Sequence, residues 1–164
     1  MKKFSQIKKS RIAKIVEDLE NNETDEATQV EQEEIQDGDS DVIKFFSKIF
    51  ESREMAHVYH LQVRGEEGSN AAHKALGHYY EDILDLLDDT IEVYQGQYGV
   101  IGSYESIDTD ETRTKDFVVY FEEVADYIKH AKQCFSEEDT HIHSLVDDIV
   151  CLVYRTLYKL KFTK

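Results

Sequence analysis

The chain contains no proline in 164 residues. Proline removes a backbone donor and clashes with the preceding turn, so a chain without it can continue helices over long distances. Four segments also repeat apolar residues at intervals of three and four, which is the spacing of one helix face. These features predict an all-α protein with helices at about residues 41–64, 69–95, 110–134 and 137–161.

The connections between these segments differ in length. Glycines in residues 65–68 end the first helix, and Ser69 is the expected N-cap of the second. Residues 108–111 and 136–139 resemble capping boxes for the third and fourth helices. A short first connection makes its helices antiparallel neighbours, and a long second connection is the ferritin-like topology. We therefore expect a ferritin-like four-helix bundle with a long crossover that contains residues 97–108.

The charge of the chain is concentrated at the N-terminus. Residues 1–14 hold six basic residues and no acid, whereas residues 17–41 hold twelve acids and no Lys or Arg. The acidic run is typical of a solvated linker. We expect residues 1–40 to form a basic helix or arm with an acidic linker, and residues 41–164 to form the bundle. Weak nucleic-acid contacts are assigned to the arm, at Lys2, Lys3, Lys8, Lys9 and Arg11.

Several classes of function are disfavoured by composition. The net charge of −16 repels nucleic acid and anionic membranes, so docking of the arm on an acidic protein surface is favoured over DNA. Cys134 and Cys151 lie in apolar helical patterns and are expected to be free, buried thiols of a reducing compartment. We find no signal-peptide pattern and no apolar run of about 18 residues, which predicts a protein without a membrane span. There is also no glycine-rich phosphate loop, Cys-x-x-Cys pair or nucleophile elbow.

Two histidines and two carboxylates form the principal candidate site. His60 ends the first helix and His73 begins the second, while Asp88 and Glu92 share one face farther along the second helix. A mixture of imidazole and carboxylate ligands suits iron and leaves positions open for an oxidant. His73 and Asp88 are about 22 Å apart along one helix at 1.5 Å per residue. A single chain therefore cannot close the site, and an antiparallel partner is required.

The spacing of these four residues resembles that of the Dps family, the miniferritins of starved bacteria. The resemblance covers about residues 41–100 and includes the glycines that follow His60 and Glu92. It implies an iron-binding protein with a ferroxidase site at a dimer interface, which oxidises ferrous iron and stores it. The metal ligands would be His60 and His73 of one subunit with Asp88 and Glu92 of its two-fold mate, and no other catalytic residue is assigned.

The same resemblance implies a homo-oligomer in the cytoplasm of a bacterium or an infected host cell, with a dimer as its smallest unit and a dodecameric shell as the larger assembly. The sequence departs from the family pattern at three points. Leu61 replaces a tryptophan, the spacing between the histidines is one residue longer, and Gly77 stands where many members have an aspartate. The glycine turn can absorb the extra residue, whereas the missing aspartate weakens a second iron position.

A second resemblance is closer. Residues 56–99 are similar to uncharacterised ferritin-like proteins encoded by tailed phages. This resemblance carries no established activity, and it implies a non-catalytic structural or cargo protein of the virion, partnered by other phage structural proteins. A further alternative uses the two Glu-x-x-His sequences at residues 54–57 and 138–141, a motif of di-iron bundles. It is less favoured because no apolar-face carboxylate occurs at matching depth in the second or third helix.

Overall fold

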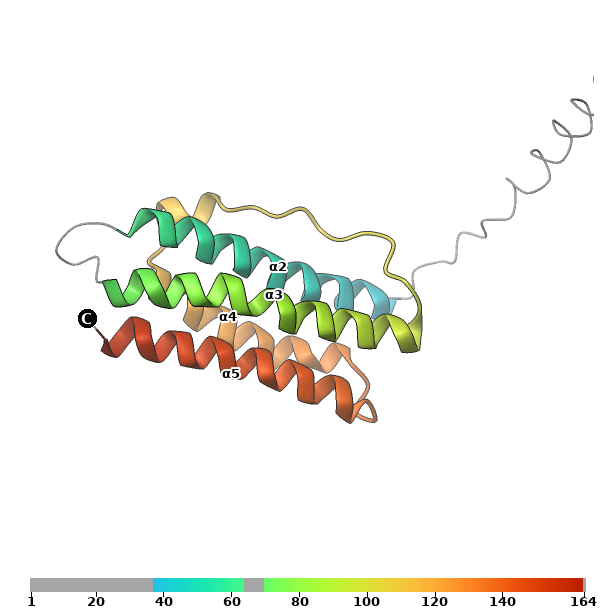
Figure 1. Ribbon diagram of the computed structural model, residues 1–164. Coiled ribbons are helices and arrows are strands. Elements are labelled where there is room, and N and C mark those ends of the chain that lie inside the picture. The colour runs from blue at the N-terminus through green and yellow to red at the C-terminus, as the bar shows by residue number, and fades with distance from the viewer. Residues whose placement is uncertain (1–36, 64–69, 164) are drawn as a thin grey trace, which may run out of the picture. The chain divides into compact units, whose positions relative to one another are not determined.

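The computed structural model describes residues 37–63 and 70–163 (Figure 1). These described residues form four α-helices and two short 3-10 helices, η1 (Asp110–Arg113) and η2 (Lys132–Cys134). They contain no strand. The prediction of an all-α protein is therefore confirmed. The four α-helices are α2 (Asp37–Gln62), α3 (Asn70–Tyr98), α4 (Phe117–Ala131) and α5 (Thr140–Phe162).

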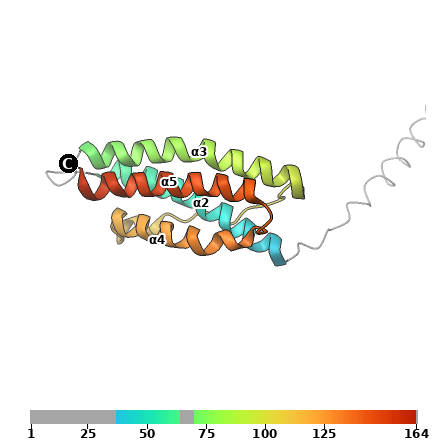
Figure 2. The ribbon, with the colours of Figure 1, turned by 90° about the horizontal axis from the view of Figure 1, so that it is seen from below.

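The four helices pack around a common core. α2 and α5 each contact α3 and α4, so α2 lies diagonally across from α5 (Figures 1 and 2). α2 and α3 run antiparallel, as do α4 and α5, whereas α3 and α4 run in the same direction (Figure 1). That direction is possible because the segment between α3 and α4 returns along α2 for most of its length (Figure 1).

The core is built from the apolar stripes that the spacing predicted. Each helix contributes large side chains that are fully buried, and Phe135 after η2 closes one end against Phe45, with ring centroids 5.1 Å apart. One polar contact crosses the interior, where the hydroxyls of Ser52 and Tyr79 lie 2.8 Å apart. The largest buried side chains are Phe45, Phe46, Ile49, Met55, Leu76, Tyr79, Ile83, Leu87, Tyr120, Phe121, Ile128 and Ile142.

The predicted start of the third helix is wrong. α4 begins at Phe117, seven residues after the predicted position, and residues 110–113 form η1 instead. Asp116 is its N-cap, because the carboxylate accepts the backbone N–H of Val118 at 2.7 Å. The carboxylate of Asp108 accepts only the N–H of Asp110, at 2.8 Å, which closes a local turn. The segment before Phe117 lacks an apolar stripe, so its capping residues have no helix to begin.

The other predicted boundaries differ by smaller amounts. α5 begins at Thr140 rather than at 137, and the hydroxyl of Ser136 accepts the N–H of Glu138 within a turn. α3 continues through Tyr98, so only residues 99–108 of the predicted crossover segment lie outside a helix. α2 already begins at Asp37, which places the boundary predicted between residues 40 and 41 inside that helix.

The predictions for the N-terminal arm and most of the acidic linker fall outside the described residues. They concern residues 1–36, including the candidate nucleic-acid contacts. Within the described residues, no helix has the length and apolar character needed to cross a membrane.

Candidate metal site

The last turn of α2 and the first turn of α3 bring the two predicted histidines together. The rings of His60 and His73 stack with their centroids 3.7 Å apart and their planes inclined by 21°. His73 is exposed to solvent and His60 is half-buried. The histidine half of the predicted site is therefore assembled within one chain.

Reciprocal hydrogen bonds hold the two rings. Nδ1 of His60 lies 2.8 Å from the carbonyl oxygen of His73, and Nδ1 of His73 lies 3.0 Å from the carbonyl oxygen of His60. A carbonyl only accepts, so both Nδ1 atoms donate, and each neutral ring keeps its lone pair on Nε2. The carbonyl of His60 belongs to the last turn of α2, where carbonyls lack an intrahelical partner. His73 therefore also caps α2.

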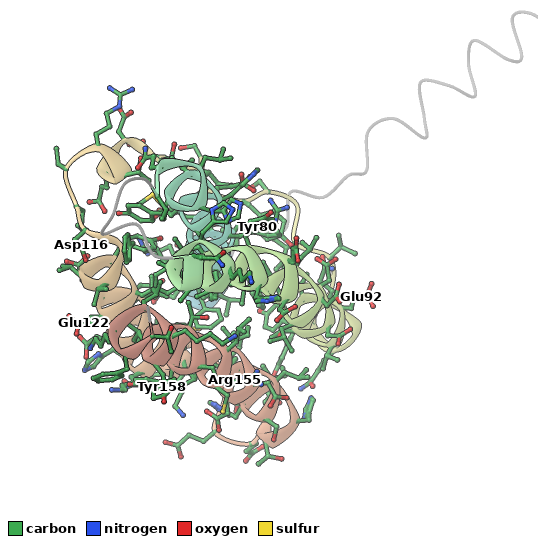
Figure 3. All side chains as sticks on the ribbon, turned by 60° about the vertical axis from the view of Figure 1, so that its left-hand side comes forward. Tyr80, Glu92, Asp116, Glu122, Arg155 and Tyr158 are labelled. Atoms are coloured by element: carbon green, nitrogen blue, oxygen red, sulfur yellow. The ribbon has the colours of Figure 1, made fainter. Side chains whose placement is uncertain are left out.

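Tyr80 and Gly77 shape the environment of His60. The ring of Tyr80 lies between α2 and α3 (Figure 3), 5.4 Å from the ring of His60 and 4.6 Å from that of His57. Gly77 lies beneath the His60 ring, and a Cβ atom at this position would be 3.3 Å from Cε1 of His60. The glycine that departs from the Dps pattern thus leaves room for the imidazole.

Asp88 and Glu92 lie apart from the histidines within one chain. Both side chains are exposed on the second half of α3, and Glu92 points into solvent (Figure 3). In the described parts of the chain, no group of three or more His, Cys, Asp or Glu residues could hold a metal ion. The ring of Tyr104 packs on Phe50 at 5.4 Å, and burial first, then the charge of Asp88, raises the pKa of Tyr104. The crossover therefore packs against α2 at Phe50.

Sequence reasoning missed a polar anchor at the opposite end of α3. The buried carboxylate of Asp139 accepts the hydroxyl of Tyr98 at 2.6 Å and the side-chain amide of Gln97 at 2.8 Å. The bond from Tyr98, followed by that from Gln97, lowers the pKa of Asp139. His141 joins the group through Nε2, 3.0 Å from Oε1 of Gln97. These contacts tie the end of α3 to the turn before α5.

The two Glu-x-x-His sequences do not come together. Residues 54–57 occupy the C-terminal half of α2, whereas residues 138–141 lie at the start of α5, at the other end of the bundle (Figure 1). Glu54 pairs with Arg53, and His141 is bound by Gln97. The alternative di-iron arrangement therefore has no common centre in this fold.

Comparison with known proteins identifies a family and no function. Residues 60–160, which are more than half of the chain, match a family of unknown function, DUF5856. No curated protein and no solved structure matches the chain. The matched region begins at His60 and includes α3, α4 and nearly all of α5. The chain therefore belongs to the DUF5856 family of unknown function.

Proposed function

We propose that the protein is a Dps-like iron-binding protein that oxidises ferrous iron at a site completed by a second copy of the chain. The observation that carries this proposal is the anchoring of His60 and His73 through Nδ1. Histidines that bind metals through Nε2 are oriented in the same way, by an Nδ1–H bond to a carbonyl or carboxylate. The long connection from α3 to α4 supports a ferritin-like topology.

The ring geometry favours two ions over one. The rings of His60 and His73 are stacked with their planes inclined by only 21°, so an ion in the plane of one imidazole, where its Nε2 lone pair lies, is out of the plane of the other. Two ligands of a single tetrahedral ion would have to converge at about 109°. Each histidine would therefore take its own ferrous ion. The ring separation of 3.7 Å is comparable to the spacing of about 3.5–4 Å between ions in two-metal sites.

A second copy supplies the carboxylates in this proposal. Asp88 and Glu92 are exposed, lie four residues apart on one helix face, and make no ion pair with a cation of the described residues. An antiparallel α3 of a two-fold mate would bring its second half beside the histidine end of this chain. Carboxylate oxygens would then balance the charge of the iron, and each ferrous ion would give one electron to dioxygen or peroxide.

Mixing two inactive variants tests the shared site. One chain carries His60→Ala and His73→Ala, and the other carries Asp88→Asn and Glu92→Gln. Neither should oxidise ferrous iron faster than buffer. Equal mixing and reassembly should restore about a quarter of the wild-type rate, because half of the dimers are mixed and each mixed dimer keeps one intact site. His78→Ala is the matched control, since this exposed α3 histidine has no ring or hydrogen-bond contact among the described residues.

The alternative, a non-catalytic ferritin-like structural or cargo protein of a phage particle, gives a different result. The hydrogen bonds between His60 and His73 satisfy backbone carbonyls without any metal, so the pair would serve only to clasp α2 to α3. His60→Ala would then lower the free energy of unfolding by about 0.5–1.5 kcal/mol, through the loss of one hydrogen bond between α2 and α3. If the wild-type protein oxidises ferrous iron no faster than buffer, the proposed ferroxidase activity is rejected and this alternative is favoured.

A further inference from the structure

A groove of about 410 Å³ runs between the C-terminal half of α5 and α4 (Figure 3, where Glu122 and Tyr158 are labelled). Three aromatic side chains of α5 border it, and they remain exposed: Tyr154 by 43%, Tyr158 by 61% and Phe162 by 72%. Soluble proteins seldom leave contiguous apolar surface of this kind uncovered unless it binds a partner. This surface of α4 and α5 is called the α4/α5 face below.

Two contacts define how the helices are aligned across the groove. Lys161 pairs with Glu122, and the ammonium of Lys129 lies 5.3 Å from the centre of the Tyr154 ring. Seven residues separate the two contacts on each helix, so both belong to one antiparallel register. In that register Asp126 lies at the level of Leu157. Arg155 and Lys159 then lie on either side of that level, each about 3 Å away along α5.

Among the described residues, the charges at this level have no partner of opposite charge on the facing helix. In the part of the chain that the structure describes, the one ion pair of Asp126 is with His130 on its own helix, with 3.7 Å between Nδ1 and the carboxylate, and this histidine attracts only when protonated. Lys129 is directed to the Tyr154 ring and makes no ion pair with Asp126. Arg155 and Lys159 are exposed and make no ion pair within the described residues. The α4 side of the groove thus presents an acid without a Lys or Arg partner among the described residues, and α5 carries two unpaired bases beside the groove, outside its lining.

We propose that the α4/α5 face is an interface between two copies of this chain, related by a two-fold axis that runs along the groove, parallel to α4 and α5. Such an axis exchanges the two sides of the groove and keeps each residue at its own level along the helices. Asp126 of each copy then lies over α5 of the other, midway between Arg155 and Lys159. The exposed rings of the two α5 helices become the apolar centre of the interface. This contact uses none of the residues of the proposed iron site.

Other occupants match only half of the surface. An acidic segment such as residues 17–36 would be attracted by Arg155 and Lys159 but repelled by Asp126. A basic segment such as residues 1–14 would be attracted by Asp126 but repelled by Arg155 and Lys159. Like charges placed against each other at an interface disfavour the wrong partner. A second copy presents both signs in the reverse order and therefore satisfies both sides at once.

Charge reversal tests the proposal on the full chain, in chelator and at low salt, by sedimentation equilibrium. Asp126→Lys should raise the dissociation constant of the contact at least tenfold, and Arg155→Asp with Lys159→Asp should do the same. The three changes together restore opposite charges in exchanged positions, so the dissociation constant should return to within about threefold of the wild-type value. Asp148→Lys is the control, because Asp148 is exposed on α5 outside the groove.

Two results would overturn the proposal. The first is a wild-type protein that remains monomeric at about 1 mM, where even a weak specific contact is populated. The second is an assembly whose size and dissociation constant are the same in the wild type and in both reversed variants. Circular dichroism of each variant serves as the folding control. We expect every variant to fold, because the substituted positions are exposed. If the reversed variants weaken association but the combined variant does not recover, the face takes part in self-association, but the pairing of Asp126 with Arg155 and Lys159 across a two-fold axis is wrong.

Discussion

The α2/α3 and α4/α5 helical hairpins differ in how their polar groups are satisfied. In the α2/α3 hairpin, neighbouring turns satisfy one another: His60 and His73 exchange hydrogen bonds with each other's carbonyls, and Ser52 meets Tyr79 in the core. The α4/α5 hairpin is closed toward the core but leaves aromatic rings and charges open on its outer side. A closed polar contact orients atoms for a small ligand such as an ion. An open amphipathic surface needs a partner of its own size.

The largest expected effect tests whether the α4/α5 face is truly open. Leu76→Ala removes a fully buried side chain of α3 and should lower the free energy of unfolding by about 2–5 kcal/mol, through lost transfer energy and a cavity. Tyr158→Ala should change it by no more than about 0.5 kcal/mol in the monomer, because the ring is mostly exposed. Urea denaturation at low protein concentration measures both. A comparable loss for the two variants would mean that Tyr158 belongs to the core.

A smaller effect is expected from the buried hydroxyl pair between α2 and α3. Ser52→Ala leaves the hydroxyl of Tyr79 without a partner in the core, which should cost about 1–3 kcal/mol. Adding Tyr79→Phe removes the unsatisfied group, so the double variant should recover much of that loss. Ser144→Ala is the control, because this exposed hydroxyl bonds only the carbonyl of Thr140 on the surface of α5. Double variants no more stable than Ser52→Ala would show that the pair is not coupled.

The comparison also shows which features were accessible from sequence. The four helices and their buried stripes were predicted, because burial imposes a spacing of three and four that survives in the sequence. The starts of α4 and α5 were not predicted, because residues 108–111 and 136–139 have the composition of helix caps but lie in turns and, at residues 110 and 111, in η1. The residue that caps α4 is Asp116, directly before the first apolar residue of the stripe. A cap is therefore informative only where a stripe begins beside it.

The candidate site was accessible in part. The proximity of His60 and His73 follows from the short connection between two antiparallel helices. Their stacking and their bonds to carbonyls depend on the exact path of both backbones, which spacing does not specify. The meaning of Gly77 was equally hidden, since its role is to admit the ring of a residue on another helix. The pairing of Asp88 and Glu92 with these histidines stays a prediction, because it depends on a second chain.

Gly77→Ala tests whether the space over Gly77 is needed to position the His60 ring. Alanine is favoured over glycine in a helix by up to about 1 kcal/mol, but the added methyl would lie 3.3 Å from Cε1 of His60 and push the ring outward. We expect a net change in unfolding free energy below about 1 kcal/mol, together with weaker zinc binding in calorimetric titration. Gly96→Ala is the matched control, because no atom lies within 4 Å of its added Cβ. Unchanged zinc binding in Gly77→Ala would show that Gly77 does not position the His60 ring for metal binding.

The smallest effect concerns acid pH and the Asp139 anchor at the other end of α3. Hydrogen bonds from Tyr98 and Gln97 favour the ionised carboxylate and lower its pKa in the folded state. The unfolded chain titrates near the ordinary aspartate pKa of about 3.9, so it takes up the proton first as the pH falls. The anchor therefore stabilises the fold above about pH 4, and this contribution is lost as the pH falls toward the lowered folded pKa. Asp139→Asn should flatten that part of the stability curve, whereas Asp148→Asn, at an exposed position, should leave it unchanged. Parallel curves for Asp139→Asn and the wild type below pH 4, measured by thermal melting, would show that the turn before α5 is held by packing and not by this carboxylate.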